Sequence, residues 1–291
     1  MMYMLLESLR AALAAIIAHK LRSFLTTLGI IIGTAAVVAV ISLTEAMSNA
    51  ISAEFENLGT NSMSVNSRTP FRERLKGRIS RITPEDLQLI QERVEGVDSI
   101  TPVLSAQTAR GGEVNYDSRT TFAQLMGTTY RYQDVNNVYA TVGRFLSKAD
   151  DNKRRRVCVI GEKTREDLEL PVNPVGEYIE ASGEWLKIVG VMEVRGELFG
   201  FSQDNYVIVP YRTLESMNGA QRRSDIRIQL TAKNAEDLPK IEQRIRVLLR
   251  RSHGLSVDQD DDFRIETPQQ IAESFDQIIT TVTAIVTGII G

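Results

Sequence analysis

The longest uncharged apolar segment of the chain runs from Leu25 to Leu43. Its nineteen residues, at about 1.5 Å each, would form a helix of roughly 29 Å, close to the hydrocarbon thickness of a bilayer. A buried core helix of this length normally carries polar positions. A secretory signal has a shorter apolar stretch with a small-residue cleavage site soon after it. Residues 25–43 are therefore predicted to be a transmembrane helix.

Apolar side chains recur at helical spacing in residues 1–24, ahead of this span. One helix face would carry Leu5, Leu6, Leu9, Leu13, Ile16, Ile17, Leu21 and Phe24. Because the segment is basic near its end and leads into the span, it is predicted to be an amphipathic helix on the cytoplasmic membrane surface. A soluble helix packed on a partner is the alternative.

The charges that flank the span are asymmetric. Arg10, Lys20 and Arg22 precede it and are opposed only by Glu7, whereas no Lys or Arg follows it before Arg68. Basic residues are retained on the cytoplasmic side. The chain is therefore predicted to lie in the cell inner (cytoplasmic) membrane, with its N-terminus inside and its main domain periplasmic or extracellular.

Residues 44–276 alternate strand and helix patterns, and they predict an extracytoplasmic α+β domain with about 230 residues available for its core. The expected strands are 100–108, 120–126, 156–160, 177–179, 185–192, 206–209, 226–230 and 263–266, with Ser182-Gly183 as a hairpin turn between 177–179 and 185–192. The expected helices run from the span to Asn57, from Thr83 to near Gly96, from Pro210 for a short distance, and from a cap at Asn234 to Gly254.

A second apolar segment closes the sequence. Thr267 and Pro268, followed by Gln270, form a helix-start signature. Charged residues end at Asp276, and 278–291 is uncharged. Residues 277–291 are predicted to be the truncated start of a second transmembrane helix, so the chain is expected to be a piece of a longer protein.

Composition changes this picture little, since the formal net charge is only −3. Cys158 is the single cysteine, which excludes an intrachain disulfide and fits a buried strand position. One basic run stands out: Arg68, Arg72, Arg74, Lys76, Arg78 and Arg81. It predicts a solvated flexible loop or a docking surface for an acidic partner. Nucleic acid is not an expected partner outside the membrane.

Candidate catalytic chemistry is sparse. The sequence contains no G-x-x-x-x-G-K-[ST] nucleotide-binding loop. His19 and His253 have no companion at metal-ligand or triad spacing, and His253 is interpreted as a helix-end cation. Residues 200–204 lack the second glycine of a nucleophile elbow. The sequence therefore predicts no catalytic residue and no cofactor, and hence a non-catalytic membrane subunit.

Two motifs leave a choice open. Asp258, Asp260 and Asp262 alternate as at the start of a calcium loop, but Phe263 and Gln269 stand where that loop needs Gly and Glu. A solvated acidic turn is the preferred interpretation, with weak ion binding as the alternative.

Gly29 and Gly33 form a G-x-x-x-G motif within the span. Small residues four apart let two helices approach closely. The motif marks a candidate helix-packing interface, although it is also common by chance.

Several short motifs together resemble a known family. Residues 7–10 and 19–33 are similar to the opening of MacB/FtsX/LolC-type ABC transporter permeases. Leu58-Gly59-Thr60-Asn61 resembles the entry into that family's periplasmic core domain. Further similar segments, in the same order, are 143–146, 173–176, 188–191 and 207–210.

This resemblance implies a four-helix permease whose first two helices bracket a MacB-like periplasmic core domain, with a porter-like part and a second subdomain. It implies homodimers or heterodimers that work with a separate ABC-type ATPase subunit and a periplasmic adaptor protein. The expected function is coupling of ATP hydrolysis to motion of the periplasmic domain for efflux or substrate release.

Two alternatives share this arrangement of span, outer domain and span. One is a two-span membrane sensor or receptor with a periplasmic sensing domain. The other is an FtsX-like cell-division regulator, whose outer domain would bind a hydrolase activator.

Overall fold

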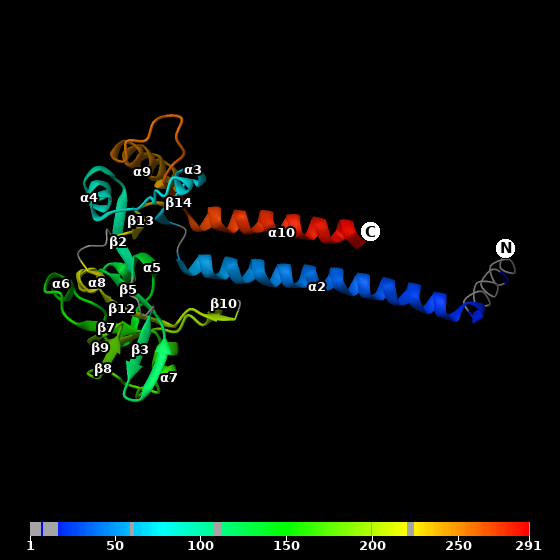
Figure 1. Cartoon of the computed structure of the whole chain (residues 1–291), viewed down its shortest axis with the longest axis horizontal. Coiled ribbons are helices and arrows are strands. Elements are labelled where there is room, and N and C mark those ends of the chain that lie inside the picture. The colour runs from blue at the N-terminus through cyan, green and yellow to red at the C-terminus, as the bar shows by residue number, and fades with distance from the viewer. Residues whose placement is uncertain are drawn as a thin grey trace. The chain divides into compact units, whose positions relative to one another are not determined.

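A computed structural model describes residue 7 and residues 17–58, 61–106, 112–198, 200–219 and 224–290. The chain divides into two compact units, Met1–Ser52 with Ala272–Gly291, and Ala53–Ile271. The first unit is helical, and the second holds the sheet (Figure 1).

The first long helix, α2 (Lys20–Leu58), contains the predicted span and continues past it, as expected. Within the described residues one segment, Lys20–Ala46, is long and apolar enough to cross a membrane, and none of it is buried inside the structure. The hydroxyl of Thr34 donates to the carbonyl oxygen of Ile30 at 2.9 Å, which satisfies a polar group inside the apolar segment. Most of the amphipathic helix predicted over 1–24 lies outside the described residues.

The second long helix, α10 (Pro268–Ile290), begins at the predicted signature. Gln270 N–H donates to the Thr267 hydroxyl, and Thr267 N–H donates to the Gln270 side-chain oxygen, each at 3.2 Å. This reciprocal capping box confirms the predicted helix start. That residues 277–291 begin a transmembrane helix stays a prediction.

The second unit is a mixed α/β domain built on one twelve-stranded sheet. Its strands are β1 (Ser62–Ser67), β2 (Val97–Ser105), β3 (Glu113–Tyr116), β4 (Arg119–Phe122), β5 (Gln124–Thr128), β6 (Ala140–Gly143), β7 (Val157–Ile160), β8 (Tyr178–Ala181), β9 (Glu184–Met192), β12 (Tyr206–Pro210), β13 (Ile226–Ala232) and β14 (Phe263–Glu266). A separate hairpin joins β10 (Glu197–Leu198) and β11 (Phe201–Ser202).

The helices of this unit are α3 (Phe71–Leu75), α4 (Pro84–Arg93), α5 (Tyr132–Asn136), α6 (Lys148–Asn152), α7 (Glu162–Asp167), α8 (Tyr211–Asn218), the 3₁₀ turn η1 (Ala235–Asp237) and α9 (Leu238–Ser252). The main path of the sheet is β14-β1-β13-β2-β5-β12-β7-β9-β8-β3-β4, and β6 pairs with β9. The β5–β12 and β7–β9 pairs are parallel and the others antiparallel. This mixed sheet, after one candidate membrane helix, is the predicted fold class.

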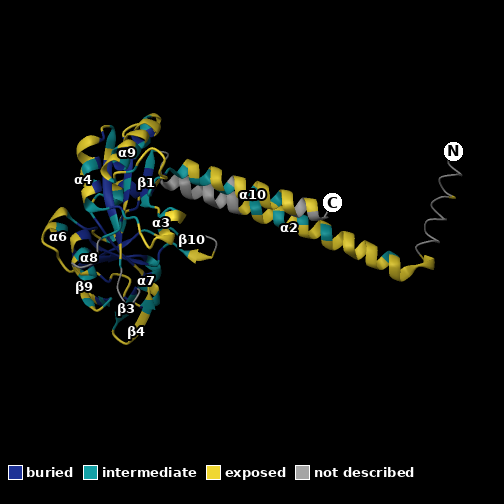
Figure 2. Ribbon diagram, turned by 45° about the horizontal axis from the view of Figure 1, so that its top comes forward, coloured by how far each residue is buried: buried dark blue, intermediate teal, exposed yellow. Residues whose placement is uncertain are grey.

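Helices α4 and α9 lie at the β13–β14 end of the sheet (Figure 1). Ile90 of α4 and Ile245 of α9 share one apolar cluster with Val65 and Ile228 of the sheet, all fully buried. Figure 2 shows buried residues concentrated along the sheet, which is where the core of this unit lies.

In this unit, the predicted helix start at Thr83 agrees with the structure and the one at Asn234 does not. Thr83 and Asp86 form a capping box at α4, as predicted. The prediction that Asn234 caps the next helix is wrong. Its side chain makes no cap hydrogen bond, and η1 intervenes before α9. The Asn234 amide instead donates to the Asp237 carboxylate at 3.1 Å.

At the other end of the sheet, the predicted hairpin around Ser182 and Gly183 joins β8 to β9. Both turn residues have positive φ, 54° and 88°, as a tight hairpin turn requires. The predicted strand 120–126 is instead two strands, β4 and β5. Strands β1, β3, β6, β10 and β11 were not predicted from the sequence; all are short, and β1 is rich in polar residues.

Candidate functional site

One end of the sheet has a polar outer face. In β13 the side chains of Ile226, Ile228 and Leu230 are buried, while Arg227 is exposed and Gln229 half-buried. Strand β14 follows the same rule, with Arg264 exposed and Phe263 buried. Successive strand residues point to opposite faces, so the arginines lie on the face opposite the apolar core.

The register of three strands sets these polar side chains in rows. Asn66 of β1 pairs with Arg264 of β14, and Ser64 pairs with Glu266. On its other edge, β1 pairs Ser64 with Gln229 of β13. Arg227 lies two residues before Gln229 on β13 and therefore on the same face of the sheet.

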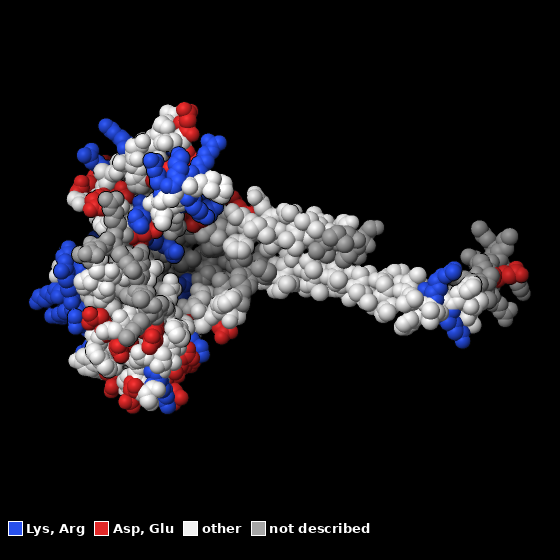
Figure 3. Space-filling view, viewed as in Figure 1, with Lys and Arg blue, Asp and Glu red and all other residues white. Residues whose placement is uncertain are grey.

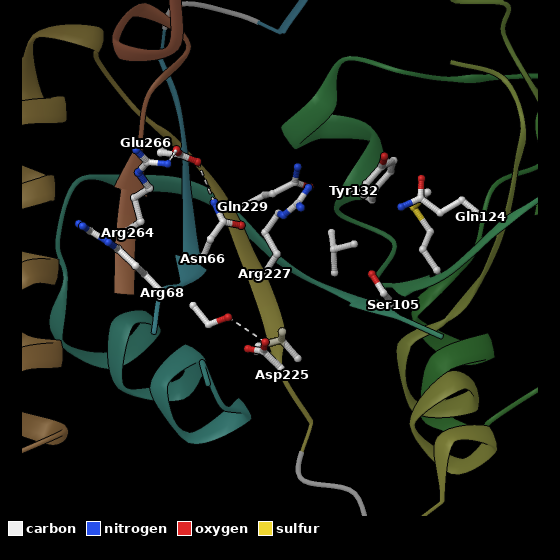
Figure 4. Close-up of a pocket in the computed structure, with 14 residues that line it drawn as sticks. Asn66, Arg68, Ser105, Gln124, Tyr132, Asp225, Arg227, Gln229, Arg264 and Glu266 are labelled. Atoms are coloured by element: carbon white, nitrogen blue, oxygen red, sulfur yellow. Dashed lines mark hydrogen bonds and ion pairs between the residues drawn. The ribbon is translucent and has the colours of Figure 1, made fainter. Parts of the chain in front are cut away.

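A cavity of about 640 Å³ opens on this face. Its walls come from β14, β1, β13, β2, β5 and α5, as Figure 4 shows. Val103 and Met126 form an apolar part of the lining, beside Ser105 and Gln124. The volume falls in the range usual for small-ligand sites.

Tyr132 of helix α5 forms part of the cavity wall. This ring stacks on Phe145, with 6.2 Å between ring centroids and 18° between planes, and burial raises the pKa of the Tyr132 hydroxyl. The Asn136 amide donates to the Gln229 side-chain oxygen at 3.2 Å. These contacts fix α5 against the polar face of β13.

Of the three arginines that line the cavity, one is paired with a carboxylate. Arg264 Nη1 lies 3.0 Å from one carboxylate oxygen of Glu266. The other oxygen of this carboxylate accepts a hydrogen bond from the Asn66 amide. Within the described part of the chain, the guanidinium groups of Arg68 and Arg227 make no ion pair or hydrogen bond. These two cations are therefore available to an anion.

Asp225 holds the loop formed by residues 68–81, which contains the predicted basic run. One carboxylate oxygen accepts from the Ser67 hydroxyl at 2.8 Å, and the other accepts from Ile82 N–H at 3.0 Å. Asp225 thus links both ends of the loop, and Ser80 N–H also donates to the Thr69 hydroxyl at 3.1 Å. Figure 3 shows Lys and Arg side chains gathered over α3, which lies within this loop.

The three aspartates of the predicted acidic turn are either paired with a cation or exposed to solvent. Asp262 lies 2.7 Å from His253 Nδ1, while Asp258 and Asp260 are exposed. The neighbouring Asp261 pairs with Arg246 and Arg250, at 2.7 and 2.5 Å. Over the described ranges, no three His, Cys, Asp or Glu side chains gather as metal ligands.

The remaining predicted residues lie apart from the cavity. Gly29 and Gly33 lie in α2, and no atom of the described chain comes within 4 Å of a Cβ placed on Gly29. His253 ends α9, as predicted, but it also bridges two carboxylates. Cys158 is fully buried in β7, and burial raises the pKa of its thiol.

A second cavity of about 670 Å³ lies on the opposite face of β2. Ile100 and Pro102 line it, whereas Val103 and Ser105 line the first cavity. Its floor is more apolar, and its rim includes Arg212, which lies near Asp151 at 4.0 Å. The first cavity gathers Arg68, Arg227 and Arg264 on one polar face, and we take it as the candidate site.

This site was not predicted from the sequence. The alternation in 226–230 and 263–266 was visible, and it places Arg227 and Arg264 on polar faces. No local signal shows that β1 lies between these two strands. The pairing of strands distant in sequence assembles the arginine row.

The chain has one candidate membrane-spanning helix, followed by a mixed α/β domain with a polar cleft. A sequence model of the MacB-like periplasmic core domain matches residues 23–248. The chain belongs to this family.

Two relatives illustrate the similarity. The macrolide export ATP-binding/permease protein MacB of Vibrio parahaemolyticus is 31% identical over 98% of this chain and 42% of its own length. The protein of the same name from Neisseria meningitidis serogroup A is 30% identical over 85% of this chain and 38% of its own length. The chain thus spans less than half the length of these relatives.

Two solved structures share the fold. The periplasmic region of MacB from Actinobacillus actinomycetemcomitans has a TM-score of 0.61 at 21% identity, covering 78% of this chain and 97% of its own. The extracellular domain of the ABC-type transporter YknZ from Gram-positive bacteria has a TM-score of 0.57 at 19% identity, covering 71% and 100%.

Proposed function

We propose that this chain is a transmembrane permease subunit of a MacB-like ABC transporter. The observation that carries the proposal is the family match over residues 23–248, which starts beside the candidate span and covers most of the α/β domain. Relatives in that family are macrolide export ATP-binding/permease proteins.

In this proposal, a separate ABC-type ATPase subunit supplies the energy. Nucleotide binding to the partner would bias a two-state assembly of permease protomers, and residues 44–276 would change shape outside the membrane. Efflux or release of a substrate, together with a periplasmic adaptor protein, would follow from that motion.

Affinity purification of the full-length protein from its native membrane, followed by mass spectrometry, tests this role. A stoichiometric ABC-type ATPase is the expected partner. A signalling protein without any ATPase would overturn the proposal and favour the two-span sensor. A murein hydrolase activator as the partner would favour the FtsX-like regulator.

The proposed orientation places the N-terminus in the cytoplasm and 44–276 outside the inner membrane. Cys158 is fully buried, so the native chain should resist thiol labelling. Val257→Cys, at a position 95% exposed, should react with a membrane-impermeant maleimide on intact spheroplasts, and Glu7→Cys should react only after lysis. The reverse pattern would refute this topology.

A further inference from the structure

The most distinctive unassigned feature of the domain is the pair of unpaired guanidinium groups in the cleft. Arg68 follows the end of β1, and Arg227 lies on the neighbouring strand. Both arginines line the same cavity. Two anionic groups of one ligand can therefore each meet a guanidinium.

The rest of the lining supports an anionic ligand without being uniformly positive. Glu266 is already paired with Arg264, and Asp225 accepts hydrogen bonds from Ser67 and Ile82. Both carboxylates thus already accept hydrogen bonds or pair with a cation, whereas within the described chain the guanidinium groups of Arg68 and Arg227 make no ion pair or hydrogen bond. Guanidinium forks bind carboxylate and phosphate groups in a bidentate geometry.

We propose that the cavity of about 640 Å³ binds a ligand carrying at least two carboxylate or phosphate groups, with Arg68 and Arg227 as its principal contacts. Tyr132 and Met126 offer an adjoining apolar surface to the body of the ligand. This inference is independent of the permease role, because binding to the isolated full chain requires no ATPase.

The test uses the full chain in nanodiscs of neutral phosphatidylcholine, with calorimetric titration at low ionic strength. The probes are tripolyphosphate and penta-aspartate, and penta-asparagine is the neutral control. Arg68→Gln/Arg227→Gln is the site variant. Arg72→Gln/Arg74→Gln is the matched control variant, since it removes the same two positive charges. Both of its side chains are exposed on α3 and lie outside the cavity.

The site variant should bind the anions about tenfold more weakly or worse, since it loses the charge-assisted hydrogen bonds of two guanidinium groups. The matched variant should change affinity by less than about twofold, as expected of exposed charges. Arg227→Lys should fall between, because it keeps the charge and loses the planar fork.

Binding of tripolyphosphate alone or of penta-aspartate alone would support the proposal and identify phosphate or carboxylate as the preferred group. Equal losses in the two double variants would reveal a general Coulombic effect and overturn it. Binding of penta-asparagine as tight as that of penta-aspartate would also overturn it, as would no binding of either anion at millimolar concentration.

Discussion

The imidazole Nε2 of His253 lies 3.2 Å from a carboxylate oxygen of Asp86. This contact ties the C-terminal end of α9 to the N-terminal turn of α4, where Asp86 also completes the capping box with Thr83. On its other side, His253 Nδ1 lies 2.7 Å from Asp262. One imidazolium therefore joins three separate segments of the domain.

This bridge predicts a loss of stability at alkaline pH. The hydrogen bonds to Asp262 and Asp86 raise the pKa of His253 from 6.5 to about 10. A raised folded-state pKa contributes stability that is complete below the unfolded pKa and is lost as pH rises through the folded one. The thermal midpoint should therefore fall between about pH 6.5 and 10.

His253→Gln provides the comparison, since other groups also titrate in this range. At pH 7 the variant should be less stable by about 2 kcal/mol, the usual contribution of a hydrogen bond to a charged group. Its further decline toward pH 10 should be shallower than that of the unmodified chain. Parallel pH profiles for the two proteins would contradict the bridge.

Asp225 should control access of proteases to the 68–81 loop. Asp225→Ala removes the acceptor of both Ser67 Oγ and Ile82 N–H, so the base of the loop should open. Limited trypsin digestion should then cut within 72–78 several times faster, because opening exposes more backbone. Asp98→Ala, at an exposed aspartate outside the loop, should leave the rate unchanged. An unchanged rate in Asp225→Ala would show that other contacts hold the loop.

Gly190 in β9 should tolerate no side chain. A Cβ there would collide with the carbonyl oxygen of Arg144 and come within 2.9 Å of that of Val142. Gly190→Ala should therefore destabilise the domain by about 1–3 kcal/mol, as overpacking does. Lys187→Ala, on the same strand at an exposed position, is the control. Chemical unfolding in detergent would measure both, and equal losses would contradict the steric explanation.

Gly29 and Gly33 should act only in assembly if they form a helix-packing interface. A Cβ at Gly29 meets no atom of the described chain within 4 Å, so Gly29→Leu should leave folding intact. It should reduce dimer cross-linking in membranes, because a large side chain keeps helices apart. Ala35→Leu enlarges a residue near the opposite helix face and is the control. Equal cross-linking in both variants would exclude this interface.

Local patterns in the sequence predicted many elements because their physical causes are local. The cap at Thr83 needs only the residues of one turn, and the β8–β9 hairpin needs only Ser182 and Gly183 in its turn. The capping prediction at Asn234 was wrong because its amide is hydrogen-bonded to Asp237 instead. Short strands such as β3 and β6 carry too few alternating residues to be recognised.

The sequence by itself determined the apolar membrane-length helix, the α+β character of the domain and the polar or apolar face of its longer strands. Hydropathy and periodicity depend on neighbouring residues, so these features can be read along the chain. Only the tertiary structure decided that β1 lies between β13 and β14. Strand partners are selected by the packing of the whole core, which brings Arg68, Arg227 and Arg264 to one cavity from three distant segments.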